Sequence, residues 1–353
     1  MRYSMENASM KVEVESLGAE LKSVLGKKSN IEYMWCSNPE YYKRSAPNLF
    51  PIVGSLKDGV YHYQGKSYKM GQHGYVRDVE WKVEKKDENT LVFTHQSDDT
   101  TKEKYPFDYA MELIYHMNGN RLEITWNIKN TGKEKMYFSC GFHPCFSCPV
   151  HGEADKSGYG YDMQMNGNVI CRDFDVESGL ALNSESELKL ENGFAAFTKD
   201  FFDNGAYVIE NNQTHEVSLR DPEGKNYLNV YFPEAPLFGL WSAEKKNAPY
   251  AAIEPWFGRC DKEDFNGSLE EREWGHALAQ GACFQAAYTI EIAGEDSLYI
   301  FIEATLPQQD NADIRLIKDS ILFQLNGIRQ EVKLRAYAQD AFTFRGKVIE
   351  KDT

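Results

Sequence analysis

The chain has 353 residues with 54 acidic and 39 basic side chains, which gives a formal net charge of −15. A surface of this sign repels phosphate backbones and anionic lipid headgroups, and no Lys/Arg-rich run offers a local exception, so we expect no nucleic-acid and no membrane partner. The content of 42% hydrophobic and 13% aromatic residues is typical of a folded protein and argues against extended disorder.

The N-terminal segment Met1–Leu21 alternates charged and apolar residues and lacks the apolar core of a secretion signal. No stretch approaches the ~20 consecutive apolar residues of a membrane-spanning helix. The seven cysteines are therefore expected to be free thiols, and the protein to be cytoplasmic.

Four segments alternate between apolar and polar residues with the period of a half-buried strand. In chain order they are Lys11–Glu15, Thr90–Thr94, Arg121–Lys129 and Tyr227–Phe232. Turn residues punctuate these runs, as they do in antiparallel hairpins. They lie at Gln64-Gly65, Asn130–Gly132 and Asp221–Gly224.

Helical patterns are sparse, and the segments that fit a short helical turn are Ser268–Glu273 and Ile317–Gln324. The sequence therefore predicts an all-β fold, a large antiparallel β-sandwich of stacked sheets.

No internal repeat or Gly/Ser linker interrupts the first 290 residues, which predicts one domain over residues 1–293. The character changes in residues 294–353, where strand-like runs alternate with polar residues. These are Ser297–Leu306, the polar loop Pro307–Ala312, and the strands Ser320–Leu325 and Val332–Tyr337, joined by the hairpin signal Asn326-Gly327. We predict a β-rich C-terminal extension, to which we assign no role.

The first candidate site combines Arg44–Gly54 with Gln72–Arg77. His73 precedes a glycine, which lets the backbone approach a ligand closely, and Gln72 and Arg77 supply fixed hydrogen-bond donors. The alternative is a structural role, with a hydrogen-bonded loop histidine beside a structural arginine.

The second candidate site is Cys140–Cys148, in which His143 lies between an aromatic residue and a proline. Cys145 and Cys148 have the spacing of a zinc knuckle, which makes a zinc site the alternative. Since no second Cys or His pair of suitable spacing accompanies them, we predict no metal site.

The third candidate site is Ile253–Gly258. Glu254 lies between an apolar strand and Pro-Trp, and partial desolvation there raises a carboxyl pKa toward the range of a general base. The alternative is a structural ion pair between Glu254 and Arg259 or Lys262.

One carboxylate and two imidazoles, without a phosphate-binding Gly loop or a serine nucleophile motif, indicate proton-transfer chemistry without a cofactor. Three aromatic side chains near these residues, Trp241, Trp256 and Phe257, suit the apolar face of a sugar ring.

The motifs follow one another as R-x-x-P-x-L-F-P-I-V-G, Q-H-G-x-x-R, G-x-H-P-x-F, L-W-S and I-E-P-W-x-G-x-x-D. This order resembles the aldose 1-epimerase (galactose mutarotase) superfamily, most of all its LacX-type bacterial branch, over roughly residues 8–293. The resemblance implies a galactose mutarotase-like supersandwich and an isomerase that interconverts the α and β anomers of an aldohexose.

The resemblance also implies a role for each residue of the acid–base trio. Glu254 matches the base that removes the proton of the anomeric C1 hydroxyl, and His143 matches the acid that protonates the ring oxygen. His73 matches the second histidine, which binds the sugar and steadies charge near the ring oxygen. Ring opening, rotation about C1–C2 and closure then need no cofactor.

Arg44, Gln72 and Arg77 match substrate-binding positions of the hexose-6-phosphate branch, which makes a hexose-6-phosphate 1-epimerase the alternative enzyme. Two positions depart from the family pattern: Ser55 stands where arginine is common, and Gly205 where an aspartate is expected, with Asp203 as its nearest replacement. These departures and the extension motivate a further alternative, a non-catalytic carbohydrate-binding protein of the same fold. The sequence predicts neither the particular sugar nor the oligomeric state.

Overall fold

The computed structural model describes residues 1–163, 165, 167–293, 315–325 and 328–338. The chain divides into two compact units, Met1–Ser297 and Leu298–Thr353. The described part of the smaller unit is one antiparallel hairpin of β25 (Arg315–Leu325) and β26 (Ile328–Ala338). The boundary predicted at residue 293 borders residues outside the described part, and it stays a prediction.

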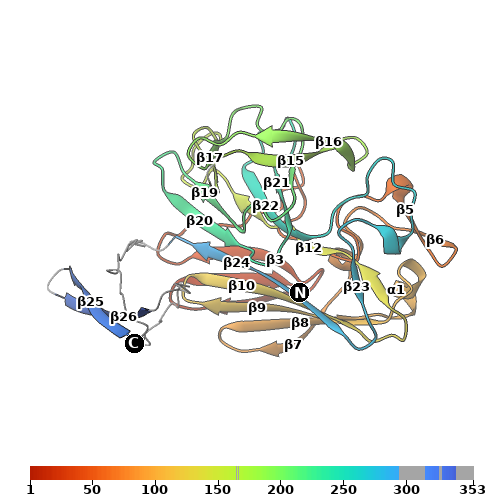
Figure 1. Cartoon of the computed structure of the whole chain (residues 1–353), viewed down its shortest axis with the longest axis horizontal. Coiled ribbons are helices and arrows are strands. Elements are labelled where there is room, and N and C mark those ends of the chain that lie inside the picture. The colour runs from red at the N-terminus through yellow and green to blue at the C-terminus, as the bar shows by residue number, and fades with distance from the viewer. Residues whose placement is uncertain (164, 166, 294–314, 326–327, 339–353) are drawn as a thin grey trace. The chain divides into compact units, whose positions relative to one another are not determined.

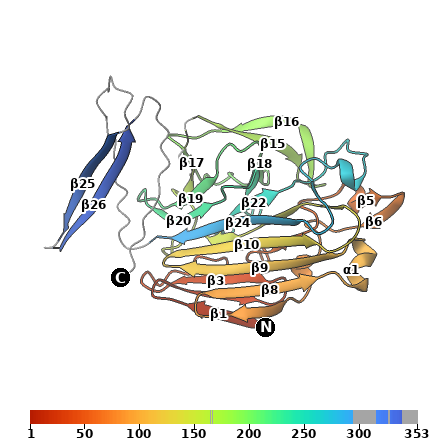
Figure 2. The ribbon, with the colours of Figure 1, turned by 60° about the horizontal axis from the view of Figure 1, so that its bottom comes forward.

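The larger unit contains two wide antiparallel sheets (Figures 1 and 2). The first has nine strands, in the order β17 (Phe194–Ala196), β14 (Gly160–Asp162), β19 (Glu216–Arg220), β20 (Asn226–Tyr231), β24 (Cys283–Ile292), β10 (Arg121–Asn130), β9 (Tyr109–Asn118), β8 (Thr90–Gln96) and β7 (Lys82–Lys86).

The second sheet has eight strands and carries the candidate site. Its order is β16 (Leu180–Leu188), β15 (Val169–Asp175), β18 (Tyr207–Ile209), β21 (Leu237–Trp241), β22 (Tyr250–Phe257), β12 (Cys140–Phe142) and β4 (Asn48–Leu49), and β13 (Cys145–Ser147) also pairs with β22.

Smaller elements complete the larger unit. These are the sheet of β1 (Arg2–Glu6), β2 (Met10–Glu15) and β3 (Glu20–Gly26), the pairs β5 (Val60–Tyr63) with β6 (Lys66–Lys69) and β11 (Met136–Phe138) with β23 (His276–Leu278), the helix α1 (Asp99–Lys104), and the 3-10 helices η1 (Lys57–Gly59), η2 (Val76–Asp78) and η3 (Leu269–Glu271).

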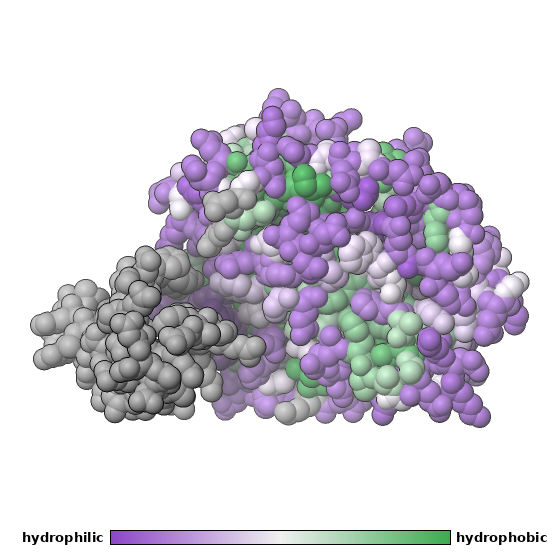
Figure 3. All heavy atoms as spheres, viewed as in Figure 1, coloured by the Kyte–Doolittle hydropathy of each residue, from purple (hydrophilic) through white to green (hydrophobic). Residues whose placement is uncertain are grey.

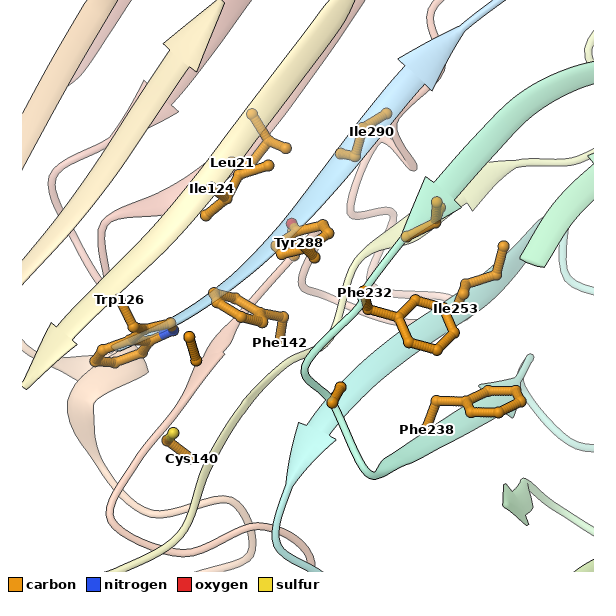
Figure 4. Close-up of a cluster of buried hydrophobic side chains, with 14 of the residues drawn as sticks. Leu21, Ile124, Trp126, Cys140, Phe142, Phe232, Phe238, Ile253, Tyr288 and Ile290 are labelled. Atoms are coloured by element: carbon orange, nitrogen blue, oxygen red, sulfur yellow. The ribbon is translucent and has the colours of Figure 1, made fainter. Parts of the chain in front are cut away.

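The core lies between the two wide sheets (Figure 4). Ile124 and Trp126 on β10 are fully buried, because alternate residues of a strand point to the same face. Phe142, at the end of β12 in the other sheet, packs 4.5 Å from Tyr288 of β24 and 6.2 Å from Trp126, measured between ring centroids. The burial of each such side chain contributes about 1.5–3 kcal/mol, so contact between the sheets drives the stacking.

The face of the larger unit seen in Figure 3 is mostly hydrophilic, with scattered apolar residues. Within the described ranges, no helix is both long enough and apolar enough to cross a membrane.

The predicted antiparallel sandwich is confirmed, and so are its four predicted strands, which lie in β2, β8, β10 and β20. The three predicted turns also occur, and at the first of them Gln64 and Gly65 both adopt positive φ. The turn predicted at Ser268–Glu273 is the 3-10 helix η3, where Ser268 and Glu271 form a capping box.

The helical turn predicted at Ile317–Gln324 is wrong, because this segment pairs along its whole length with β26 as part of β25. The two strands predicted there lie within β25 and β26. Helix α1 was not predicted, although Asp98 and Thr101 form its capping box. The predictions for Ser297–Leu306, Pro307–Ala312 and Asn326-Gly327 lie outside the described residues.

We expect residues 1–297 to fold on their own, because the last strand of the wide sheets, β24, ends at Ile292. The thermal midpoint of this shortened chain should lie within about 4 °C of the full chain's, the shift that roughly 1 kcal/mol produces in a domain of this size. Scanning calorimetry of both chains checks this. Loss of a cooperative transition would show that the core needs the C-terminal unit.

Candidate active site

The eight residues predicted to act or bind all line one cavity of about 580 Å³ in the larger unit. They are Arg44, Gln72, His73, Arg77, His143, Trp241, Glu254 and Trp256. The cavity therefore brings together motifs that lie up to 212 residues apart in the chain, from Arg44 to Trp256.

The register of the eight-stranded sheet places His143 beside Glu254. β22 pairs with β12 at Gly141↔Trp256 and with β13 at Cys145↔Ala252. Midway between these pairs, the position across from Glu254 is His143. The two side chains are buried, and Nε2 of His143 lies 3.3 Å from a carboxylate oxygen of Glu254.

Aromatic rings hold the His143 imidazole in place. The ring of Tyr42 stacks on it at 5.4 Å with an interplanar angle of 20°, and the rings of Trp241 and His73 stand edge-on at 5.5 and 5.6 Å. The Sγ atom of Cys145 lies 3.7 Å from Nδ1 of His143, which leaves Nε2 directed at Glu254.

His73 sits in a strained turn that a neighbouring glycine makes possible. Its φ is 64°, and Gly74 follows with φ 71°, where an added Cβ would lie 2.0 Å from the carbonyl oxygen of Phe50. Nδ1 of His73 accepts a hydrogen bond from the Gly54 amide at 3.1 Å. Nε2 therefore carries the ring proton and can donate it to a ligand. The histidine is hydrogen-bonded, as the structural alternative supposed, and it also lines the cavity.

Two arginines form a connected polar flank. Arg77 donates to the carbonyl oxygen of Gln72 at 2.6 Å, and Arg44 donates to the carbonyl oxygen of Arg77 and to Asp78 at 3.2 and 2.5 Å. The exposed Lys43 adds a third positive charge to the lining. Nε of Arg77 is buried without a hydrogen-bond partner among the described residues, so it can bind a ligand.

Two glycines allow the indole of Trp256 to lie along the sheet. An added Cβ would lie 2.8 Å from this ring at Gly239 and 2.9 Å from it at Gly141, on the strands that flank β22. Nε1 of Trp256 is another buried donor without a well-formed hydrogen bond in the described part of the chain, and the carboxyl of Glu254 lies near it. In contrast, Nε1 of Trp241 donates to Glu244 at 2.8 Å. Phe257 points to the opposite face, where it packs on Phe284, so its predicted proximity to the site is wrong.

Burial governs protonation in the cavity. It raises the pKa of the Glu254 carboxyl well above its ordinary value, and the nearby Trp256 indole opposes this rise. It lowers the pKa of His143 to about 3, and it lowers that of His73 well below the ordinary value, with help from His143. Burial therefore favours a protonated carboxyl and neutral imidazoles.

The structural alternative for Glu254 is wrong. Arg259 pairs instead with Glu210, at 2.5 Å, and with Glu273, which Lys262 also contacts at 2.9 Å. The zinc alternative at Cys145 and Cys148 gains no support, since the described residues include no group of three or more His, Cys, Asp or Glu side chains placed to hold a metal ion.

The positions that depart from the family pattern lie at the edge of the site. Ser55 accepts a hydrogen bond from the Asp261 amide through its carbonyl oxygen, at 2.9 Å. Gly205 adopts φ 87° beside Phe174. Asp203 lines a separate, smaller cavity, so it does not replace the expected aspartate.

Several lining residues were not predicted. They are Tyr42, Lys43, Asp78, Phe174, Val176, Gly179, Ala206, Val208, Glu244 and Cys260, whereas Gly54 belongs to the first predicted segment and lines the cavity as well. Tyr42 and Lys43 directly precede the Arg44 motif, so extending that motif by two residues would have found them. Phe174 and Val176 carry no such signal.

The family model described as aldose 1-epimerase matches residues 1–290. The chromosomal protein LacX of Lactococcus lactis subsp. lactis is 29% identical over 287 residues, which cover 77% of this chain and 93% of LacX. A galactose mutarotase related enzyme from Lactobacillus acidophilus has a TM-score of 0.78 at 33% identity, over 83% of this chain and 98% of its own. A galactose mutarotase-like protein from Lactobacillus casei ATCC 334 also has a TM-score of 0.78, at 26% identity, over 83% of this chain and 100% of its own.

The raised pKa of Glu254 predicts that Glu254→Gln stabilises the protein above about pH 4.5. The unfolded carboxyl loses its proton there, while the folded one keeps it, so the wild type loses stability as the pH rises. The advantage of the variant should grow by up to about 1.4 kcal/mol per pH unit. Urea unfolding at pH 4, 6 and 8 measures it, with the exposed Glu223→Gln as matched control. A constant difference across this range would contradict the prediction.

Proposed function

This chain belongs to the aldose 1-epimerase family, and on that basis we propose that it is an isomerase that interconverts the α and β anomers of an aldohexose by acid–base catalysed ring opening. The observation that carries the proposal is the buried contact of 3.3 Å between His143 and Glu254 in a cavity lined by unpartnered polar atoms.

The unpartnered atoms support a ligand rich in hydroxyl groups. Nε of Arg77 and Nε1 of Trp256 are buried without well-formed hydrogen bonds to the part of the chain that the structure describes, and Oε2 of Glu254 has only its 3.3 Å contact with His143. Each such group costs about 1–3 kcal/mol when nothing satisfies it. Sugar hydroxyls both donate and accept, so one bound sugar can satisfy all three, while the indole faces of Trp241 and Trp256 suit its apolar C–H surface.

In the proposed reaction, Glu254 as carboxylate takes the proton of the C1 hydroxyl. The bond between C1 and the ring oxygen breaks, and the ring oxygen takes a proton from Nε2 of protonated His143. The products are an open-chain aldehyde with a new C5 hydroxyl, a neutral carboxyl and a neutral imidazole. Rotation about C1–C2 and the reverse transfers close the other anomer.

The buried environment favours these transfers. A carboxylate with a raised pKa is a stronger base and an imidazolium with a lowered pKa is a stronger acid, so both proton transfers lead to the neutral forms that burial prefers. The hydrogen bonds from the sugar stabilise the charged pair before the reaction. The Nε2–H group of His73 then steadies negative charge near the ring oxygen.

We expect Glu254→Gln to lower the rate of catalysed mutarotation by roughly 10²–10⁴, the usual contribution of general acid–base catalysis, while sugar binding persists. Polarimetry of freshly dissolved α-D-glucose and α-D-galactose measures the rate, and calorimetry measures binding. Glu216→Gln is the matched control, because burial raises that carboxyl's pKa too, but Glu216 lies on β19 in the other wide sheet.

An unchanged rate in Glu254→Gln would contradict the role of Glu254 as base. Sugar binding by the wild type without catalysis at any pH would instead favour the carbohydrate-binding protein without activity.

One observation favours a second candidate, a hexose-6-phosphate 1-epimerase. Three cations, Lys43, Arg44 and Arg77, line one flank of the cavity, and Asp78 neutralises only part of their charge. A phosphate group binds to such a flank through charge-assisted hydrogen bonds.

If this flank binds a phosphate, glucose-6-phosphate should react faster than glucose, and Lys43→Ala should reduce that advantage by about threefold to tenfold. The advantage should also fall between low and physiological salt, because salt screens charges at the cavity mouth. NMR anomer exchange on both sugars checks this, with Lys129→Ala on the exposed face of β10 as matched control. Faster reaction of the free sugar at every salt concentration would exclude the phosphate candidate.

A further inference from the structure

The flank of the cavity opposite the arginines is apolar. Phe174 and Val176 line it from β15 and the turn that follows, and Ala206 and Val208 line it from β18 and the residue before that strand. Phe174 packs against the buried cluster that contains Val208 and Trp256. We call the four residues Phe174, Val176, Ala206 and Val208 the apolar wall.

The charged register partner of Val208 is held in ion pairs and does not line the cavity. Arg172 is the register partner of Val208, but it pairs with Glu185 at 2.6 Å and contacts Glu210 at 3.5 Å. None of these three charged residues lines the cavity. Within the described lining, β15 and β18 thus offer no charged side chain to a ligand.

Two glycines fix the apolar wall in place. At Gly205 an added Cβ would lie 2.6 Å from the ring of Phe174 and 3.1 Å from a methyl group of Val176, and its φ of 87° disfavours any other residue. At Gly179 an added Cβ would lie 2.7 Å from Oγ of Ser55, so this glycine allows the turn after β15 to reach Ser55. The amide of Gly179 closes that turn by donating to Asp175 at 2.7 Å.

The strand order places the catalytic pair between the two flanks. β15 and β18 lie on one side of β22, and β12 and β4 lie on the other. Across the sheet, Val208 pairs with Gly239 and Gly239 pairs with Glu254, while His143 lies on the far side of Glu254. His73 also lies on that far side, since the next residue, Gly74, forms a β-bridge with Phe50, which directly follows β4.

This order fixes which part of a bound sugar meets which flank. C1 of an aldopyranose is bonded to the ring oxygen on one side and to C2 on the other. With the C1 hydroxyl at Glu254 and the ring oxygen at His143, C2 points toward Gly239 and Val208. C5 and C6, which follow the ring oxygen, point toward His73 and the arginines.

We infer that the apolar wall faces C2 of the bound sugar, so that this protein does not recognise the C2 hydroxyl and accepts 2-deoxyaldoses as readily as the parent aldoses. The inference rests on the proposed function, because the roles of Glu254 and His143 set the orientation of the sugar.

Removal of one hydroxyl group from the sugar has opposite effects on the free energy of binding at the two flanks. At the apolar wall, a CH₂ group replaces a hydroxyl that would have lost its hydrogen bonds to water on binding, so its removal costs nothing or improves binding. On the arginine flank, a missing hydroxyl leaves a buried donor unpaired, which is the situation in which binding sites reject an analogue most strongly.

The test measures catalysed mutarotation of D-glucose, 2-deoxy-D-glucose and 6-deoxy-D-glucose by NMR anomer exchange, each rate divided by the uncatalysed rate of the same sugar. We expect kcat/KM for the 2-deoxy sugar to lie within about threefold of glucose or above it. For the 6-deoxy sugar we expect a loss of about tenfold or more, which corresponds to about 1.4 kcal/mol. A loss of more than tenfold on 2-deoxyglucose would overturn the inference.

Variants of the apolar wall sharpen the test. Val208→Thr and Val176→Thr keep the side-chain shape and replace a methyl group with a hydroxyl. We therefore expect either variant to lower the ratio of kcat/KM for 2-deoxyglucose to kcat/KM for glucose by about threefold or more. Val176 is 49% exposed, so its variant should fold even if the buried Val208 variant does not. Ile170→Thr is the matched control, because this residue is also exposed on β15 but lies outside the cavity. Folded variants with the wild-type ratio would overturn the inference.

Failure of the proposed function has a different signature. If no aldose reacts faster with the protein than without it, both the proposed function and the inference are wrong. If the parent sugars are accelerated and the 2-deoxy sugar is rejected, the function stands and only the apolar wall is misassigned.

Discussion

The buried contact between Glu254 and His143 is the constraint on which the rest of the site depends. A carboxyl and an imidazole meet at 3.3 Å. Burial raises the pKa of the carboxyl and lowers that of the imidazole, so it favours the neutral form of each. Such a contact needs a rigid backbone, because a flexible backbone would let water reach the two side chains and restore their ordinary pKa values. The pairing of β22 with β12 on one side of His143 and with β13 on the other supplies this rigidity.

The wide sheet also explains how one cavity can present unlike surfaces to one ligand. Seven strands lie in order from β16 to β4, and the reacting pair stands near one end of that series. Residues from β15 and β18 therefore meet one edge of a ligand, while the loops beside β4 meet the other. Gly239 and Gly141 have no side chains, so the Trp256 indole can lie over the strands beside β22, between those two edges of the ligand. Changes on one flank can thus alter the choice of sugar without moving the acid and the base.

The sequence predicted the fold and the chemical residues for different reasons. Alternation over Arg121–Lys129 identifies a strand whatever its neighbours are, and β10 follows it almost to the residue. Glu254, His143 and His73 stand among Gly, Pro and aromatic residues that serve no alternating pattern. The apolar wall could not be found in this way, because Phe174 and Val176 look like ordinary residues of a hairpin. Their place in the site follows from the packing of Gly205 and Gly179, which only the folded chain reveals. The helical turn expected at Ile317–Gln324 failed for a similar reason, since pairing with β26 decides its conformation.

Three polar atoms of the cavity are free to form hydrogen bonds with a ligand. Nε of Arg77 and Nε1 of Trp256 make no hydrogen bond within the described structure, and Oε2 of Glu254 has only its contact with His143 at 3.3 Å, so all three are available to a ligand. The core between the two sheets stabilises the fold that holds these atoms in place, since side chains such as Phe142 and Tyr288 bury large apolar surfaces. Nε of Arg77 lies on the arginine flank, the atoms of Glu254 and Trp256 lie between the two flanks, and the apolar wall contributes no such atom. A ligand therefore finds hydrogen-bonding groups at the centre of the cavity and on the arginine flank, and an apolar surface at the wall.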